Sequence, residues 1–400
     1  MAQKTLREMF AGFGEGGNGV FRDRDVLGIR YTPQTVPHRD DQIKQLASVV
    51  APSTRGGRIS NVFVYGKTGT GKTLVVKNIL GELKRSSNDI CPLYINCKMK
   101  KVSDTEYRLF AELIRTLGED VPATGLPTDV VYKRFFEMID SKKQNVILVL
   151  DEIDTLVKKI GDDILYNLTR INQDLKNTKL SIIGISNDIS FTDNMDPRVR
   201  SSLSEEEIIF PPYNASQIQD ILLARTGLAF NKGGIGPGVI EKCSALAAQE
   251  HGDARRALDL IRMAGEIAER RESNQVQIRD VDTAEHKLDS DRVVEIVRAQ
   301  PKQSQAVLAS IIKLLDAGRK GVQTGDIFSV YESIASETGL KELTQRRITD
   351  LIGELDMLGV INARVISKGR YGRTREINLQ LPQTTLNNIK QILADGYLLK

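Results

Sequence analysis

Two groups of residues in this sequence have the types and spacing needed to hold a phosphate chain. The first is a glycine-rich run that ends in a lysine and a hydroxyl: Gly66-Lys67-Thr68-Gly69-Thr70-Gly71-Lys72-Thr73. Glycines let backbone N–H groups point at an anion without a Cβ in the way. Lys72 would then reach the β- and γ-phosphates, while the Thr73 hydroxyl would hold Mg²⁺. The run therefore predicts a site for ATP or ADP with Mg²⁺.

The second group is an acidic pair, Asp151 and Glu152, which directly follows an apolar run over 146–150. Such a run is typical of a central parallel strand, and ligands bind at the carboxyl ends of these strands. We expect Asp151 to hold Mg²⁺, directly or through water, and Glu152 to polarise the attacking water as general base. The next apolar run ends just before Asn187, whose amide could orient the same water or simply make a turn.

Strands and helices alternate around these residues. The β-branched and aromatic residues at 62–65 predict a strand that leads into the glycine loop, and the apolar spacing over 74–83 predicts the helix that follows it. Further strands over 92–96, 146–150 and 179–185, with helices over 105–117 and 128–139, indicate an α/β domain with a parallel sheet. Upstream, the segment 22–42 contains two prolines and is expected to be extended.

Length and composition limit the class of protein. A chain of 400 residues with 40% hydrophobic and 27% charged residues is typical of a globular protein with two or three domains. No apolar run approaches the length of a membrane span, so no membrane partner is expected. The net charge of +4 means that any nucleic-acid surface must be local. Three cysteines without a C-x-x-C pair indicate thiols of a reducing cytoplasm.

The alternation of strands and helices stops at the Phe-Pro-Pro sequence of 210–212, and helical periodicity then continues to about residue 290. Within this part, Gly252 and Asp253 can end one helix and cap the next. Arg255 then falls in the first turn, where a positive charge opposes the helix dipole. This placement hints at an anionic ligand, although a chance arginine would look the same.

The C-terminal part has the pattern of a winged helix, a variant of the helix-turn-helix. Three amphipathic helices over 304–315, 324–337 and 344–358 precede a β-hairpin over 359–381. Arg346 and Arg347 open the third helix, where a recognition helix would meet bases. The stretch 364–375 holds five basic residues and no acidic one, which favours double-stranded DNA over a merely solvated turn. The hairpin-tip residues expected to touch DNA are Lys368, Arg370, Tyr371 and Arg373.

These motifs together resemble an AAA+ ATPase. The Pro-His-Arg sequence at 37–39, Ile-Ser-Asn-Asp at 185–188 and the basic wing at 369–375 are similar, more specifically, to the archaeal origin-recognition and cell-division-control type replication initiators. The resemblance implies four parts. They are a flexible N-terminal segment (1–20), an α/β AAA+ P-loop domain (21–212), a helical lid domain (213–290) and a C-terminal winged-helix DNA-binding domain (291–400).

The resemblance also implies roles for single residues. Asn187 would be sensor 1 and Arg255 sensor 2, both near the γ-phosphate, while Tyr213 and Arg225 would help to bind ATP. The helices over 105–139 match an insertion that touches DNA in these initiators. The chain would act as an ATP-dependent replication initiator that binds origin DNA and helps to recruit or load the replicative helicase. Slow hydrolysis would act as a switch, and the protein would be cytoplasmic and associated with the nucleoid.

Two other functions fit the same motifs: a winged-helix AAA+ DNA motor and a nucleotide-binding transcription regulator. Further copies of the initiator are an additional partner that the resemblance leaves open. Arg198 or Arg200 could serve as an arginine finger toward a neighbouring copy or be a surface charge. Eukaryotic relatives often read Arg-Val-x-Ser-Arg at this point, whereas this chain ends the motif in Ser202.

Overall fold

The computed structural model describes residues 19–28, 31–99, 102–122, 125–191, 195–203, 206–319, 321–367, 373–379 and 381–399. The side chains at 365–367, 373 and 374 lie outside this description. The chain divides into two compact units, Met1–Val281 and Asp282–Lys400. Both this division and the expected boundary at 290/291 fall within one helix, α12 (Ile278–Ala299).

The first unit is built on a five-stranded sheet with the order β2-β3-β4-β1-β5. All neighbouring strands are parallel, so their carboxyl ends meet at one edge. In the register of this edge, Asn96 lies opposite Asp151, and Asp151 lies opposite Ile185. The strands are β1 (Val62–Tyr65), β2 (Ile90–Asn96), β3 (Gln144–Asp151), β4 (Thr178–Ser186) and β5 (Glu206–Ile209). The prediction of an α/β domain with a parallel sheet is therefore confirmed.

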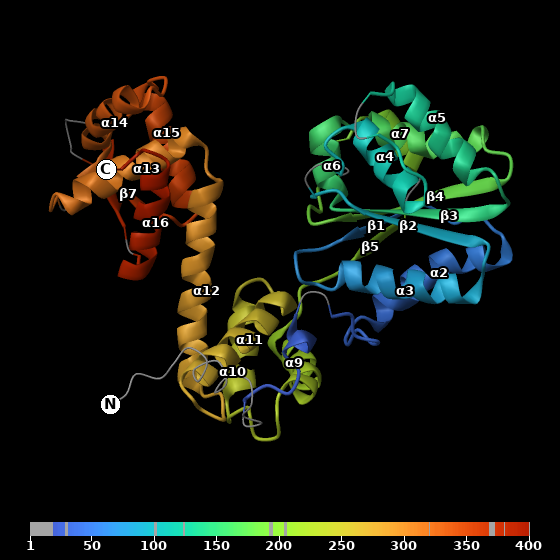
Figure 1. Cartoon of the computed structure of the whole chain (residues 1–400), viewed down its shortest axis with the longest axis horizontal. Helices are drawn as coiled ribbons and strands as arrows, with labels where there is room; N and C mark the ends of the chain where they lie inside the picture. The colour runs from blue at the N-terminus through green and yellow to red at the C-terminus, as the bar shows by residue number, and fades with distance from the viewer. Residues whose placement is uncertain are drawn as a thin grey trace. The chain divides into compact units, whose positions relative to one another are not determined.

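Helices cover both faces of this sheet (Figure 1). One face packs against α2 (Asp40–Val50) and α3 (Lys72–Ser86), with the short 3₁₀-helix η2 (Ala51–Arg55) beside them. The other face carries the larger apolar core. Its helices are α4 (Glu106–Thr116), α5 (Thr128–Ile139), α6 (Ile153–Ile160), α7 (Asp163–Arg170), η3 (Ile171–Gln173) and α8 (Pro197–Leu203). β3 is buried along its whole length, as its apolar sequence predicts.

The helical part that follows contains α9 (Ala215–Ala229), α10 (Val239–Gln249), α11 (Ala254–Arg270) and the start of α12. An Asn214 capping box starts α9, and Asp253 caps α11 by accepting the N–H groups of Arg255 and Arg256. The N-terminal segment lies against these helices, because Arg22 donates to the carbonyls of Gly227 and Leu228 in α9. The expectation of an extended segment was wrong for 24–27. Asp23 caps a 3₁₀-helix there, η1 (Arg24–Leu27).

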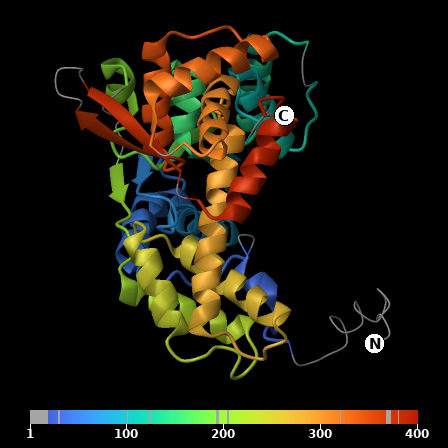
Figure 2. The same cartoon turned by 90° about the vertical axis from the view of Figure 1, so that its left-hand side faces the viewer.

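The second unit has the predicted three helices and hairpin of a winged helix. The helices are α13 (Lys302–Asp316), α14 (Thr324–Thr338) and α15 (Gln345–Met357), and β7 (Asn362–Ser367) and β8 (Arg373–Asn378) form the antiparallel hairpin. The hairpin strands are the red arrows of Figure 2. Two elements were not predicted. They are β6 (Val322–Gln323), which pairs with β8, and α16 (Gln383–Asp395), whose Ile389 and Leu393 enter the core of this unit.

Among the described residues, no helix has the length and apolar content that crossing a bilayer requires.

Packing between β1 and β4 leaves no room for a side chain at Gly184. Gly184 lies opposite Phe63, and a Cβ at this glycine would overlap the Phe63 ring. We expect Gly184→Ala to lower the free energy of unfolding by about 1–3 kcal/mol, since an overpacked core must shift. Gly81→Ala in α3 is the matched control. A Cβ at Gly81 meets open space, so we expect a gain of about 0.5–1 kcal/mol. Urea unfolding followed by circular dichroism measures both, and equal effects would contradict the packing argument.

Candidate nucleotide site and DNA-binding surface

The glycine loop connects β1 to α3 and encloses the ammonium of Lys72. Gly69 and Gly71 have φ values of 72° and 92°, a region that side chains other than glycine rarely adopt. The Lys72 Nζ donates to the carbonyl oxygens of Gly66 (2.7 Å) and Lys67 (2.8 Å) and to Asn187 Oδ1 (2.9 Å). The structure therefore brings together the predicted lysine and the predicted Asn187 at the end of β4.

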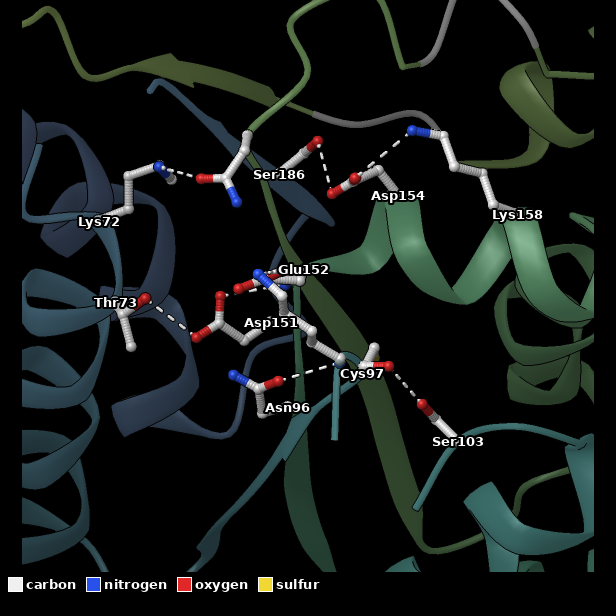
Figure 3. Close-up of polar contacts among 12 residues, drawn as sticks. Lys72, Thr73, Asn96, Cys97, Ser103, Asp151, Glu152, Asp154, Lys158 and Ser186 are labelled. Carbon is white, nitrogen blue, oxygen red and sulfur yellow. Dashed lines mark hydrogen bonds and ion pairs between the residues drawn. The ribbon is translucent and has the colours of Figure 1, made fainter. Parts of the chain in front are cut away.

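Asp151 is the second centre of this site, at the end of β3. Its Oδ2 accepts hydrogen bonds from Thr73 Oγ1 (2.9 Å) and from the Tyr94 hydroxyl (2.6 Å). Its Oδ1 accepts the backbone N–H of Glu152 at 3.0 Å. Figure 3 shows Thr73 on α3 facing Asp151, with Lys72 on the same side. The predicted pair of Thr73 and Asp151 is thus in direct contact.

Glu152 begins α6 in an unusual backbone conformation. Its φ of 57° and ψ of 47° lie in the left-handed region, which costs a non-glycine residue free energy and often marks a functional site. Its carboxylate Oε2 lies 3.6 Å from Lys98 Nζ, on the loop after β2. The Glu152 side chain is 22% exposed and that of Lys98 72% exposed, so the carboxylate faces a site open to water.

The helical part contacts the glycine loop through the start of α11. The N–H of Ala254 donates to the Gly69 carbonyl at 3.3 Å, and the Asp253 carboxylate occupies the space that a side chain at Gly69 would fill. Arg255 lies close enough to Lys72 to disfavour its charge. Burial, as the largest cause, lowers the pKa of Lys72 to about 8. The negative charge of Asp151 opposes this shift in part, and the positive charge of Arg255 adds to it. The structure therefore places the predicted Arg255 beside the phosphate loop.

Arg225, in α9, is a buried cation whose hydrogen bonds are incomplete. The side chain is 8% exposed, and its Nε has no hydrogen-bond partner among the described residues. The guanidinium lies 4.3 Å from the ring centroid of Tyr31, and burial lowers its pKa. A buried, unpaired donor is costly unless a ligand satisfies it, which is compatible with the predicted role in nucleotide binding.

Arg39, which no motif singled out as a site residue, connects the parts of this site. It is 2% exposed, and its Nε and Nη2 donate to the carbonyls of Thr70 (2.9 Å) and Pro211 (2.6 Å). Its guanidinium also stacks on the ring of Tyr213, 3.7 Å from the centroid. The Tyr213 hydroxyl in turn lies against Gly71. Arg39 and Tyr213 thus hold the phosphate loop to the start of the helical part.

The two candidate finger arginines, Arg198 and Arg200, both lie in α8. Arg198 donates to both carboxylate oxygens of Asp196, at 3.1 and 3.0 Å, while its side chain stays 84% exposed. The choice between an arginine finger and a surface charge therefore stays open for both.

On the winged helix, the two arginines of the predicted recognition helix differ. Thr344 caps α15, and Arg347 then reaches along the helix to Glu354 (3.2 Å) and Asp350 (4.0 Å). Arg346 is exposed and has no ion-pair partner among the described residues. Of the hairpin-tip residues, Lys368, Arg370 and Tyr371 lie outside the described residues, and Arg373 is described only as backbone at the start of β8.

Family models match three stretches of the chain. They are an AAA domain over residues 57–189, a Cdc6 AAA+ ATPase-type lid domain over 219–286 and a CDC6 C-terminal winged-helix domain over 295–388. The fold and the site therefore define an AAA+ ATPase with a Cdc6-type lid and winged helix.

Whole-chain relatives narrow this class. ORC1-type DNA replication protein 1 of Methanosarcina mazei is 53% identical over 390 residues, which are 96% of this chain and 92% of the relative. The ORC1-type DNA replication protein of Thermococcus onnurineus is 51% identical over 92% of this chain and 90% of its own. The solved structure of the Aeropyrum pernix ORC1 protein in complex with DNA has 43% identity and a TM-score of 0.81, covering 95% of this chain and 98% of that one. The chain belongs to the family of ORC1-type DNA replication proteins.

Arg39 provides a test of how the site is held together. We expect Arg39→Met to lower the free energy of unfolding by about 1–3 kcal/mol for each carbonyl left unpaired, those of Thr70 and Pro211. Nucleotide affinity should fall as well, because the loop loses its anchor. Arg85→Met, on the exposed end of α3, should change stability by no more than about 0.5 kcal/mol. Calorimetric unfolding and ADP titration check this, and equal stability of the two variants would refute the anchoring role.

Proposed function

We propose that this chain is an ATP-dependent DNA replication initiator. In this proposal it binds origin DNA through its winged helix, binds ATP at the AAA+ site and helps to recruit or load the replicative helicase. Slow hydrolysis of ATP acts as the switch between two states. Family membership supports the general role in DNA replication, and the related Aeropyrum pernix ORC1 protein has been solved in complex with DNA.

The arrangement of charge around Lys72 carries the nucleotide part of the proposal. The positive charge of Arg255 contributes to lowering the pKa of Lys72, and the Arg255 guanidinium has no hydrogen-bond or ion-pair partner among the described residues. Lys72 lies in the loop, and the backbone next to Arg255 contacts the loop at Gly69, so two cations near a loop of backbone N–H groups match a polyanion. Asp151 and Thr73, which are in hydrogen-bond contact, supply the hard oxygen ligands that Mg²⁺ prefers, and phosphates would complete its coordination. The described residues therefore fit a Mg²⁺–nucleoside triphosphate.

The chemistry follows from the same positions. When bound, Mg²⁺ neutralises charge on the phosphate oxygens. Lys72 and Arg255 would stabilise the negative charge that develops on the transferred phosphoryl group. Glu152, half-buried between β3 and α6, would accept a proton from the attacking water, and Asn187 would hold that water or the γ-phosphate. Tyr213 and Arg225 would hold the nucleotide at the lid side.

Experiments can distinguish the initiator from two alternative functions. A branch-migration type motor would hydrolyse ATP rapidly under stimulation by junction DNA, and a transcription regulator would bind DNA independently of nucleotide. A genome-wide footprint of the bound protein is the sharpest test of the initiator role. Peaks at a few replication start sites are expected, and peaks spread over promoters would overturn it.

Glu152 is the test of the hydrolysis mechanism. We expect Glu152→Gln to bind ATP as the wild type does but to hydrolyse it roughly 10²–10⁴-fold more slowly, the usual cost of losing a general base. Glu112→Gln, which removes a surface carboxylate paired with Arg115, is the matched control and should hydrolyse normally. Single-turnover assays measure the rate, and wild-type hydrolysis by Glu152→Gln would show that another group is the base.

Arg346 and Arg347 should contribute unequally to DNA recognition. Arg346 is free of described ion pairs, so Arg346→Ala should cost roughly 1–3 kcal/mol on the cognate site and little on random DNA. Arg347→Ala should cost less, since Glu354 already holds its guanidinium. Arg370→Ala in the wing should weaken both DNAs alike and lower the salt slope by about one, as phosphate contacts do.

Titrations of origin and scrambled duplexes at several salt concentrations distinguish these effects. Arg298→Ala is the control, because Arg298 is an exposed arginine paired with Glu295 on α12. If all three variants bind every duplex like the wild type, the winged helix is not the DNA reader.

A further inference from the structure

Tyr94 in β2 has a role that no nucleotide-binding motif assigns. Its hydroxyl donates to Asp151 Oδ2 at 2.6 Å, from a strand that contributes nothing to the glycine loop or to the acidic pair. We propose that Tyr94 is a positioning residue for Mg²⁺, which fixes the Asp151 carboxylate in the orientation that receives the metal or its bound water. This inference rests on the proposed binding of a Mg²⁺–nucleotide at this site.

The hydrogen bonds of Asp151 define that orientation. A carboxylate offers about four acceptor positions. Three are used here, by Thr73 and Tyr94 on Oδ2 and by the Glu152 N–H on Oδ1. One position is left, on Oδ1. Because Asp151 is 4% exposed and held from three sides, its carboxylate is oriented before any metal arrives.

Thr73 alone would be a poor anchor for this carboxylate. A hydroxyl has one hydrogen and two lone pairs, so Thr73 can donate to Asp151 only while its hydroxyl keeps that rotation. Thr73 is itself expected to coordinate the metal, which constrains its hydroxyl further. Tyr94 coordinates nothing in this scheme, and so its hydrogen bond to Oδ2 persists whether or not the metal is bound.

Contacts with α3 hold the Tyr94 ring in place. On the parallel sheet, Tyr94 faces α3, where it packs beside the apolar cluster of that face. The Lys77 Nζ lies 4.0 Å from the centroid of its ring. Lys77 follows Thr73 by four residues, so both lie on one face of α3 and reach the same pair, Tyr94 and Asp151. The helix that carries the phosphate loop thus also secures the tyrosine.

The tyrosine hydroxyl is the donor in this contact. An ionised carboxylate can only accept, so the single hydrogen of the phenol hydroxyl lies between Tyr94 and Asp151 Oδ2, at an oxygen–oxygen distance of 2.6 Å.

Tyr94→Phe removes the hydroxyl and keeps the ring, so it tests the hydrogen bond alone. ADP binding is measured by calorimetry in EDTA and over a series of free Mg²⁺ concentrations, and Mn²⁺ binding to the ADP complex is measured by electron paramagnetic resonance. We expect the Mg²⁺ midpoint and the Mn²⁺ dissociation constant to rise roughly 10-fold, the lower end for such supporting partners. ADP affinity in EDTA should stay within about twofold of the wild type, since the phosphate loop is intact.

Tyr107→Phe is the matched control. The Tyr107 hydroxyl also makes a 2.6 Å hydrogen bond, to the Pro122 carbonyl in the same domain, but the residue does not touch Asp151. Tyr107→Phe should leave both metal readings unchanged. An unchanged Mg²⁺ midpoint in Tyr94→Phe would overturn the inference, as would an equal loss of ADP affinity in EDTA, which would indicate general damage to the loop. If the wild type binds no ADP with or without Mg²⁺, the result contradicts the proposed function itself and not only the role of Tyr94.

Discussion

The nucleotide site depends on one buried cation, Arg39. A guanidinium removed from water is costly unless its donors are satisfied, and burial lowers the pKa of Arg39 accordingly. The carbonyls of Thr70 and Pro211 and the ring of Tyr213 satisfy it. One of these partners belongs to the phosphate loop, and the other two belong to the connection between sheet and lid. The loop and the start of the lid are therefore fixed to the same group, and neither can move far without leaving a charge unpaired.

Around Arg39, the positive and negative side chains of the site come from different secondary-structure elements. Cations come from α3 and α11, as Lys72 and Arg255, whereas carboxylates come from the ends of the strands and from the cap of α11. The positive charge of Arg255 disfavours the charge of Lys72, and a bound anion would offset this effect. Asp151, which accepts three hydrogen bonds, is the carboxylate at which we propose the divalent cation. The protein groups therefore match a ligand that carries both charges, a nucleotide with its metal.

Features formed by residues close together in the sequence were the ones best predicted from it. The glycine loop and the acidic pair each lie within a few residues of the strand that precedes them, so motif and periodicity predicted Lys72, Thr73, Asp151 and Glu152 as site residues. Arg39 was missed as a site residue because its Pro211 partner lies 172 positions away in the sequence. Tyr94 was missed because only the register of β2 on β3 places it near Asp151. The pairing of Arg347 with Asp350, three residues further along α15, could have been anticipated from helical spacing. By contrast, the two-residue strand β6 is too short to give a period.

The residues of the nucleotide site and those of the winged helix lie in two units with separate apolar cores. Substitutions in one unit should therefore have effects independent of those in the other, unless α12 connects them. Each end of that helix is fixed within its own unit. Near its start, the Asp280 carboxylate is buried and accepts a 2.8 Å hydrogen bond from Arg271 in the lid. Near its end, Val297 is buried in the core of the winged helix. One continuous helix, α12, therefore has residues in the packing of both units. Substitutions in α12 are thus the ones for which independence of the two units is least expected.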